Sequence, residues 1–223
     1  MSAARGGVET NWLIARPPTQ DAALRPVIAL HGRNGNAAKV MDLGVGDALA
    51  KLGAAGRRGI AVVSVDGGDS YWHRRTWGED SGAMVIDELL PMLASQGFDT
   101  SRVAFLGWSM GGYGALLLGA RLGPARTAGI CAVSPALWTS GLFTDPGAFD
   151  GPLDWKNNTV FGLPALAQIP LRVDCGTGDR FAFATRRFIA THATPVAGGF
   201  SPGGHDDAFW RSHLFDELMW LAS

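Results

Sequence analysis

The sequence predicts one α/β domain, built on a mostly parallel β-sheet with helices on both faces. Short runs of apolar, β-branched residues alternate with longer segments in which apolar residues recur every three or four positions. This alternation is typical of repeated βα units. The short runs are apolar throughout, as expected of strands covered by helices on both faces. A length of 223 residues and a hydrophobic content of 47% fit a single domain over residues 1–223.

The alternation places six strands and four helices. The strands are expected at residues 27–30, 60–65, 103–106, 129–133 and 171–175, with a less clearly marked one near 193–197. The helices are expected at residues 37–52, 82–95, 110–122 and 206–221, and Ser81 is a candidate N-cap of the second. Between residues 134 and 170 the pattern gives way to Pro, Gly, Trp and Asn. A long irregular segment in a compact domain is often functional, so a small cap over the site is expected there.

Composition restricts the class of ligand. The 19 basic and 20 acidic residues give a formal charge of −1, which provides no attraction for nucleic acid or an anionic membrane. No apolar run reaches the roughly 18 residues of a membrane-spanning helix. Cys131 and Cys175 fall in apolar runs and are expected to be buried core residues. Residues 1–8 lack a signal-like apolar stretch, so a cytoplasmic location is the default expectation, or a secreted one if a leader was removed.

A G-x-S-x-G sequence at residues 107–111 contains the candidate nucleophile, Ser109. So short a pattern can occur by chance, and its flanks decide its meaning. The apolar run 103–106 precedes it and a helical pattern begins at Met110, which gives the strand, sharp turn and helix of a nucleophile elbow. A Cβ at Gly107 or Gly111 would clash where the helix starts against the strand. We therefore predict Ser109 as a nucleophile, against the alternative of a serine that only caps a helix.

A serine needs a general base, and in this arrangement the acid and then the base follow the serine along the chain. His31 and His73 precede Ser109 and fail this order. His205 lies in a glycine-rich loop just before the last expected helix and is the predicted base. His213 falls inside that helix and is expected to be a surface or packing residue, and His192 lies where another helix is expected to end.

Asp179 is the predicted acid. It follows the strand 171–175 by a short Gly-Thr-Gly turn, which places it at the carboxyl end of the sheet, where ligands bind in open α/β folds. Asp174 lies within the strand, and Asp206 and Asp207 are suited to cap the helix after His205.

Two backbone N–H groups are expected to stabilise the oxyanion. One belongs to Met110, at the start of the helix after Ser109. The other comes from the glycine-containing loop 31–36 after the first expected strand, where Arg33 is the predicted donor and Gly32 and Asn34 are alternatives. His31 is expected to hold this loop by hydrogen bonds.

The substrate pocket is expected to be lined by aromatic residues. Tyr71 lies in the loop 66–75, which leaves the strand 60–65 at the same edge of the sheet, and Trp108 precedes the nucleophile. Trp138 belongs to the 134–170 segment and suggests an apolar or aromatic substrate group, although tryptophan also fills cores. Arg74 and Arg75 are expected either near the pocket or on a solvated loop.

Over most of its length the chain resembles the esterase D (putative esterase) family of α/β hydrolases, which includes S-formylglutathione hydrolases, feruloyl-type esterases and antigen 85 mycolyltransferases. The resemblance implies an α/β-hydrolase fold, with Ser109 as nucleophile, Asp179 as acid, His205 as base and the backbone of Arg33 and Met110 as the oxyanion hole. It rests on these motifs: Leu30-His31-Gly32, Asp66-Gly67-Gly68, Asp87-Glu88-Leu89-Leu90-Pro91, Gly107-Trp108-Ser109-Met110-Gly111-Gly112-Tyr113-Gly114-Ala115, Asp174-Cys175-Gly176-Thr177-Gly178-Asp179 and Gly203-Gly204-His205-Asp206.

The function predicted from the sequence is hydrolysis of a small or medium carboxylic ester through an acyl-enzyme on Ser109. No cofactor is expected, and no metal, because no two histidines have the spacing of a zinc site. The expected partner is a small-molecule ester, and the oligomeric state is left open. An acyltransferase of the mycolyltransferase type is the alternative, since both reactions share the triad. A non-catalytic module that only binds a ligand is the third hypothesis.

Overall fold

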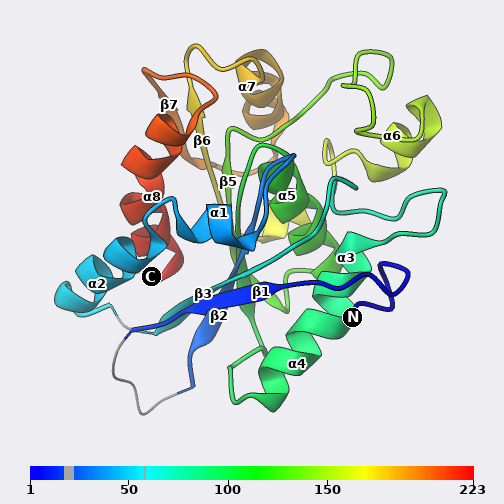
Figure 1. Ribbon diagram of the computed structural model, residues 1–223. Coiled ribbons are helices and arrows are strands. Elements are labelled where there is room, and N and C mark those ends of the chain that lie inside the picture. Colours follow the sequence, from blue (N-terminus) through cyan, green and yellow to red (C-terminus); the bar gives the residue numbers. More distant parts are fainter. Residues whose placement is uncertain (18–22, 58) are drawn as a thin grey trace.

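A seven-stranded sheet forms the centre of the molecule in the computed structural model, which describes residues 1–17, 23–57 and 59–223 (Figure 1). The strand order is β1-β3-β2-β4-β5-β6-β7. β1 pairs antiparallel with β3, and the other described pairs are parallel. The strands are β1 (Trp12–Ala15), β2 (Arg25–Leu30), β3 (Ile60–Val65), β4 (Val103–Trp108), β5 (Thr127–Val133), β6 (Leu171–Gly176) and β7 (Ala197–Ser201). The predicted mostly parallel α/β class is confirmed.

Helices cover both faces of the sheet (Figure 1). One face packs against α1 (Ala37–Met41), α2 (Val45–Ala54) and α8 (Asp207–Leu221). The other packs against α4 (Leu90–Ser95), α5 (Met110–Leu122) and α7 (Ala182–Thr191). A π-helical segment (Met84–Leu89) joins α3 (Ser81–Ala83) to α4, and α6 (Pro152–Asn158) and a 3₁₀ turn (Leu166–Gln168) complete the described helices.

Alternation along the central strands divides the core into two layers. In β4, Phe105 packs on the α5 side, whereas Ala104 and Leu106 pack on the α8 side. Such alternation is the two-residue period of a strand, and here both faces are apolar because both are covered. Cys131 and Cys175 are buried free thiols, as predicted. No helix in the described parts of the chain is long and apolar enough to cross a membrane.

Several element boundaries differ from the prediction. The helix expected over 37–52 ends at Met41 and restarts at Val45, because Gly44 adopts a left-handed φ of 101° between α1 and α2. The sixth strand lies at Ala197–Ser201 rather than near 193–197, where Pro195 cannot donate to a strand ladder. The N-cap of α3 is Asp80, whose carboxylate accepts the N–H of Ala83, so the assignment to Ser81 was wrong.

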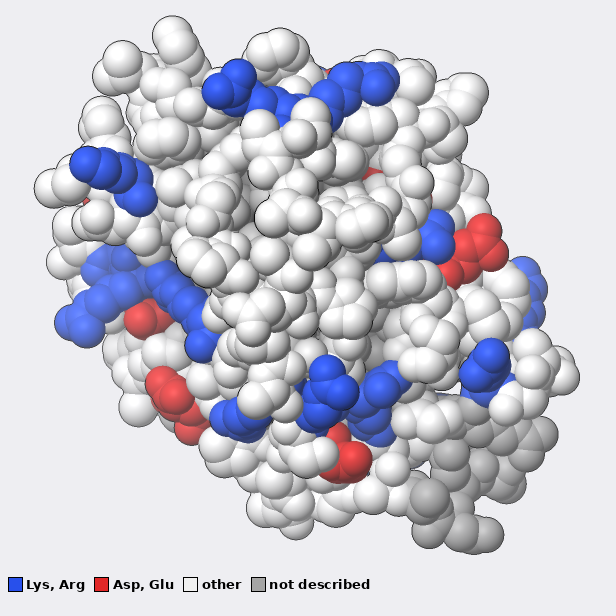
Figure 2. All heavy atoms as spheres, turned by 180° about the vertical axis from the view of Figure 1, so that it is seen from behind, with Lys and Arg blue, Asp and Glu red and all other residues white. Residues whose placement is uncertain are grey.

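The surface opposite the view of Figure 1 carries charges of both signs. Figure 2 shows Lys and Arg side chains in small groups, with Asp and Glu side chains among them and larger uncharged areas between. The described part of this face therefore has no continuous basic surface of the kind that binds a polyanion.

Candidate active site

Ser109 sits on a strained turn between β4 and α5. Its φ of 56° and ψ of −118° lie outside the ordinary regions for a residue with a side chain. The turn is tight enough that a Cβ on Gly107 would lie 2.1 Å from the carbonyl oxygen of Gly111, and one on Gly111 would lie 1.9 Å from that of Leu30. Only glycine fits at these two positions, which supports the elbow geometry expected from the sequence.

The structure brings Ser109, His205 and Asp179 together. His205 Nε2 lies 2.8 Å from Ser109 Oγ, and His205 Nδ1 lies 2.8 Å from Asp179 Oδ2. Ser109 follows β4, Asp179 follows β6 and His205 follows β7, so the three residues meet at the carboxyl edge of the parallel strands. The order and spacing of the three side chains match the arrangement in which a serine nucleophile, a histidine base and an orienting acid are linked by hydrogen bonds.

The carboxylate of Asp179 is held in its ionised form. Burial alone would raise its pKa, but hydrogen bonds from the His205 ring and from the Phe181 N–H, 2.8 Å from Oδ1, lower the pKa below the ordinary value. An ionised Asp179 accepts the Nδ1 proton of His205 and leaves Nε2 free to accept the proton of Ser109. The rings of Phe181 and Trp210 flank the imidazole, each at 5.3 Å between centroids, and hold its orientation.

His31 holds the loop that follows β2. Its Nδ1 donates to the Gly32 carbonyl at 2.7 Å, and its Nε2 accepts the Gly67 N–H at 2.9 Å. Burial lowers the pKa of His31, which favours the neutral ring that can make both bonds. The contacts of His31 therefore match the loop-holding role predicted for it. The loop passes close to Ser109, since a Cβ on Gly32 would lie 3.4 Å from the Ser109 Cβ.

A pocket of about 610 Å³ opens over Ser109 and His205. Tyr71 and Trp108, both predicted, belong to its wall, and so does Arg33. Tyr71 has an unusual positive φ of 56°, and burial raises the pKa of its phenol to about 12, so it is a neutral hydroxyl at physiological pH. The pocket therefore joins an apolar aromatic wall to the proposed reacting groups, as small-molecule sites commonly do.

Comparison with known proteins identifies the family. Residues 27–221 match the Putative esterase family. The chain belongs to this family. It is 26% identical over 174 residues to an iron(III) salmochelin esterase of Escherichia coli, a match that covers 71% of this chain but only 42% of the length of that relative.

Solved structures of esterases share the fold. A ferulic acid esterase superposes with a TM-score of 0.82 at 19% identity, covering 99% of this chain and 94% of its own. An S-formylglutathione hydrolase from Agrobacterium tumefaciens superposes with a TM-score of 0.75 at 21% identity, covering 96% of this chain and 89% of its own. The predicted family and the α/β-hydrolase fold are thereby confirmed.

In this member of the esterase family, Trp138 lies behind the pocket wall. Its ring contacts Phe181 at 5.3 Å and Tyr71 at 5.8 Å between centroids, and Trp138 is 9% exposed. It therefore supports two wall residues and does not itself line the pocket, unlike Tyr71 and Trp108.

The segment 134–170 lies mainly beside the pocket. Tyr113 of α5 donates to the Asn158 carbonyl at 2.8 Å and anchors α6 on the α5 side of the sheet. Among the described residues of this segment, Asp145 is the one that lines the pocket. There it forms an ion pair with Arg180. The expected cap thus contributes one side chain to the pocket and otherwise supports the loop of Tyr71.

Sequence reasoning missed several wall residues, among them Arg180, Phe181 and Trp210. Arg180 and Phe181 directly follow Asp179, and Trp210 lies one helical turn after Asp206, so their closeness to the predicted acid and base along the chain was the available signal. The described side chains suited to hold an ion, Cys131, Asp174 and Glu217, lie on the α8 face of the sheet and do not adjoin Ser109.

Proposed function

We propose that this chain is a serine carboxylesterase that hydrolyses a small or medium carboxylic ester through an acyl-enzyme on Ser109. The observation that carries the proposal is the pair of 2.8 Å contacts that join Ser109 to His205 and His205 to Asp179, with Ser109 and His205 lining the pocket. Membership of the esterase family supports ester hydrolysis as the reaction class.

In the proposed mechanism, Ser109 Oγ attacks the ester carbonyl carbon while His205 Nε2 takes the serine proton. Asp179 stabilises the resulting imidazolium through Nδ1. The N–H groups of Arg33 and Met110 stabilise the tetrahedral oxyanion, a role supported by the closeness of the 31–36 loop to Ser109 and by the position of Met110 at the start of α5.

Collapse of the tetrahedral intermediate breaks the bond to the alcohol oxygen, which receives the proton from His205. Water then attacks the acyl-enzyme, with His205 again acting as the base, and releases the acid and free Ser109. The aromatic wall of Tyr71, Phe181 and Trp210 supports an apolar or aromatic group on the substrate.

Ser109→Ala tests the proposal. We expect kcat for a short-chain p-nitrophenyl ester to fall by at least about 10⁴-fold, because the nucleophile is lost while the fold is kept. Ser95→Ala, at an exposed serine at the end of α4, is the matched control and should keep full activity. Activity of Ser109→Ala within a few-fold of the wild type would contradict the assignment.

Two further measurements address the alternatives. A fluorophosphonate probe should form a covalent adduct on Ser109 that mass spectrometry can locate, and its absence would favour a non-catalytic binding module. Product analysis in the presence of trehalose or another alcohol should yield the free acid. A dominant transesterification product would favour the acyltransferase alternative.

A further inference from the structure

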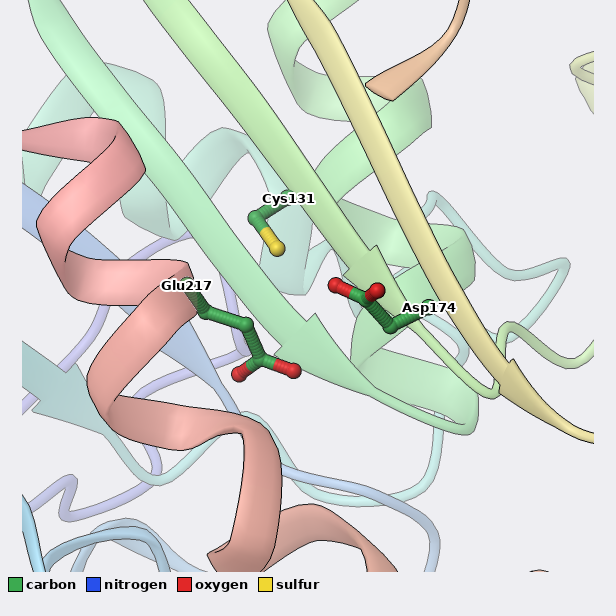
Figure 3. Close-up of side chains that lie close together, drawn as sticks. All are labelled: Cys131, Asp174 and Glu217. Atoms are coloured by element: carbon green, nitrogen blue, oxygen red, sulfur yellow. The ribbon is translucent and has the colours of Figure 1, made fainter. Parts of the chain in front are cut away.

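A cluster of ionisable side chains lies inside the protein, between the sheet and α8. Cys131 comes from β5, Asp174 from β6 and Glu217 from α8, and Figure 3 shows their side chains converging on one point. Cys131 Sγ and one carboxylate oxygen from each acid all lie within 4.8 Å of one another. The three residues are 0%, 5% and 0% exposed. Three elements far apart in the chain thus bring a thiol and two carboxyl groups together away from water.

Glu217 is the member whose carboxyl group has no hydrogen-bond partner among the described residues. Both of its carboxylate oxygens are buried and accept no hydrogen bond from the described residues. Its neighbours on the same face of α8, Leu214, Leu218 and Leu221, are core residues, and a hydrophobic side chain would fit this pattern. A buried carboxylate without a partner is strongly unfavourable, so the negative charge of Glu217 must be neutralised by a proton or by a cation.

The surrounding charge suits a divalent cation. Arg172 Nε lies 2.6 Å from Asp174 Oδ2 and forms an ion pair with it. Burial and the neighbouring carboxylates raise the pKa of Cys131 and of Glu217 well above their ordinary values, because both disfavour an uncompensated negative charge at this place. When Cys131 and Glu217 release their protons, the three ligands carry three negative charges. The guanidinium of Arg172 and one divalent cation carry three positive charges, so the cluster is neutral.

We propose that Cys131, Asp174 and Glu217 form a structural binding site for Zn²⁺. A thiolate combined with carboxylates is a donor set for a borderline-soft ion, whereas Mg²⁺ and Ca²⁺ take oxygen ligands alone. The second carboxylate oxygen of Glu217 can complete a four-coordinate shell. Binding exchanges the thiol proton of Cys131 and the carboxyl proton of Glu217 for the ion.

Such an ion would connect the parts of the protein that carry the acid and the base. Asp174 lies in β6, which leads to Asp179, and Glu217 lies in α8, which begins two residues after His205. A metal link between β6 and α8 would therefore stabilise the positions of both loops without touching a reacting atom. The histidine-spacing test applied to the sequence could not find this site, because the set contains no histidine.

The test uses the full chain, freed of metal by a chelator and then titrated with Zn²⁺ or Co²⁺. We expect about one Zn²⁺ per chain by elemental analysis after desalting. Saturating Zn²⁺, at about 100 times Kd, should raise Tm by about 5–10 °C. Co²⁺ should give a thiolate-to-metal charge-transfer band in the near ultraviolet, which an oxygen-only surface site cannot produce.

Variants locate the ion. Cys131→Ser should remove the cobalt band, and Glu217→Gln, which keeps the shape of the side chain, should reduce the zinc content to a small fraction of one equivalent. Cys175→Ser, at the other buried cysteine, is the matched control and should behave as the wild type. The proposal fails if the wild-type chain retains no zinc and shows neither the Tm shift nor the band. It also fails if Cys131→Ser and Glu217→Gln fold and bind the metal as the wild type does.

Discussion

Arg75 joins the loop of Tyr71 to the 134–170 segment, and the mutation Arg75→Met tests how the pocket wall is held. The side chain of Arg75 is 1% exposed, and its Nη2 and Nε donate to Asp150 Oδ1 at 2.6 and 3.0 Å. Its Nη1 donates to the carbonyls of Gly147 and Ala148 at 2.9 and 3.1 Å. Methionine keeps most of the volume of the side chain but makes none of these bonds.

The expected cost follows from what Asp150 loses. Removing one partner of a buried ion pair typically costs about 3–5 kcal/mol. The side chain of Asp150 is 12% exposed and still accepts the Thr76 N–H at 2.7 Å, so it is partly compensated. We therefore expect a loss of about 3 kcal/mol in the free energy of unfolding at pH 7, which corresponds to a fall in Tm of about 6–12 °C for a chain of this size.

The measurement is equilibrium unfolding in urea, followed by tryptophan fluorescence and checked by circular dichroism. Arg74→Met is the matched control, because the neighbouring Arg74 is exposed, and its effect should stay within about 0.5 kcal/mol. A loss below about 1 kcal/mol for Arg75→Met in a natively folded protein would refute the reasoning.

The same variant has a characteristic pH dependence. Burial tends to raise the pKa of Asp150, but hydrogen bonds from Arg75 and the Thr76 N–H lower it overall. A carboxyl group with a lowered pKa adds stability above its ordinary pKa and loses it as pH falls through the folded-state value. The gap between wild type and Arg75→Met should therefore be constant from pH 6 to 8 and narrow below about pH 4.

Two further predictions concern the elbow and a buried histidine. Gly111→Ala would place a Cβ 1.9 Å from the Leu30 carbonyl oxygen and should yield little folded protein. Gly46→Ala in α2 is the control, because no heavy atom lies within 4 Å of the added Cβ. It should raise the free energy of unfolding by about 0.5–1 kcal/mol. Equal Tm values for the two variants would contradict the elbow argument. Burial lowers the pKa of His73 despite its hydrogen bond to Asp154, so below about pH 6.5 the unfolded chain takes up a proton that the native state does not. As pH falls below this value, His73 should therefore lower the free energy of unfolding by up to about 1.4 kcal/mol per pH unit. His73→Gln should flatten this dependence on pH, and a slope equal to that of the wild type would contradict the prediction.

The elements that could be predicted are those whose sequence pattern lies in one uninterrupted stretch of the chain. Strand β4, the glycines at 107 and 111 and helix α5 are contiguous, so the elbow was visible as one stretch of sequence. Strand β1 was missed because it is a run of only four residues, and at the edge of the sheet these residues are half-buried or exposed. Helix α7 was not among the four helices placed from the sequence, although its end was expected near His192. The break between α1 and α2 depends on the backbone of one glycine.

Residue order and local pattern determined the fold class, the family and the candidates Ser109, Asp179 and His205. Chain order ranks such candidates, but it cannot measure distances between residues that are far apart in sequence. The hydrogen bonds of His205, the burial of Arg75 against Asp150 and the place of Trp138 behind Tyr71 were decided by tertiary packing. The meeting of Cys131, Asp174 and Glu217 was decided in the same way, because it arises only when α8 packs across β5 and β6. Local sequence sets the backbone path of each element, whereas contacts between elements depend on how the whole core packs.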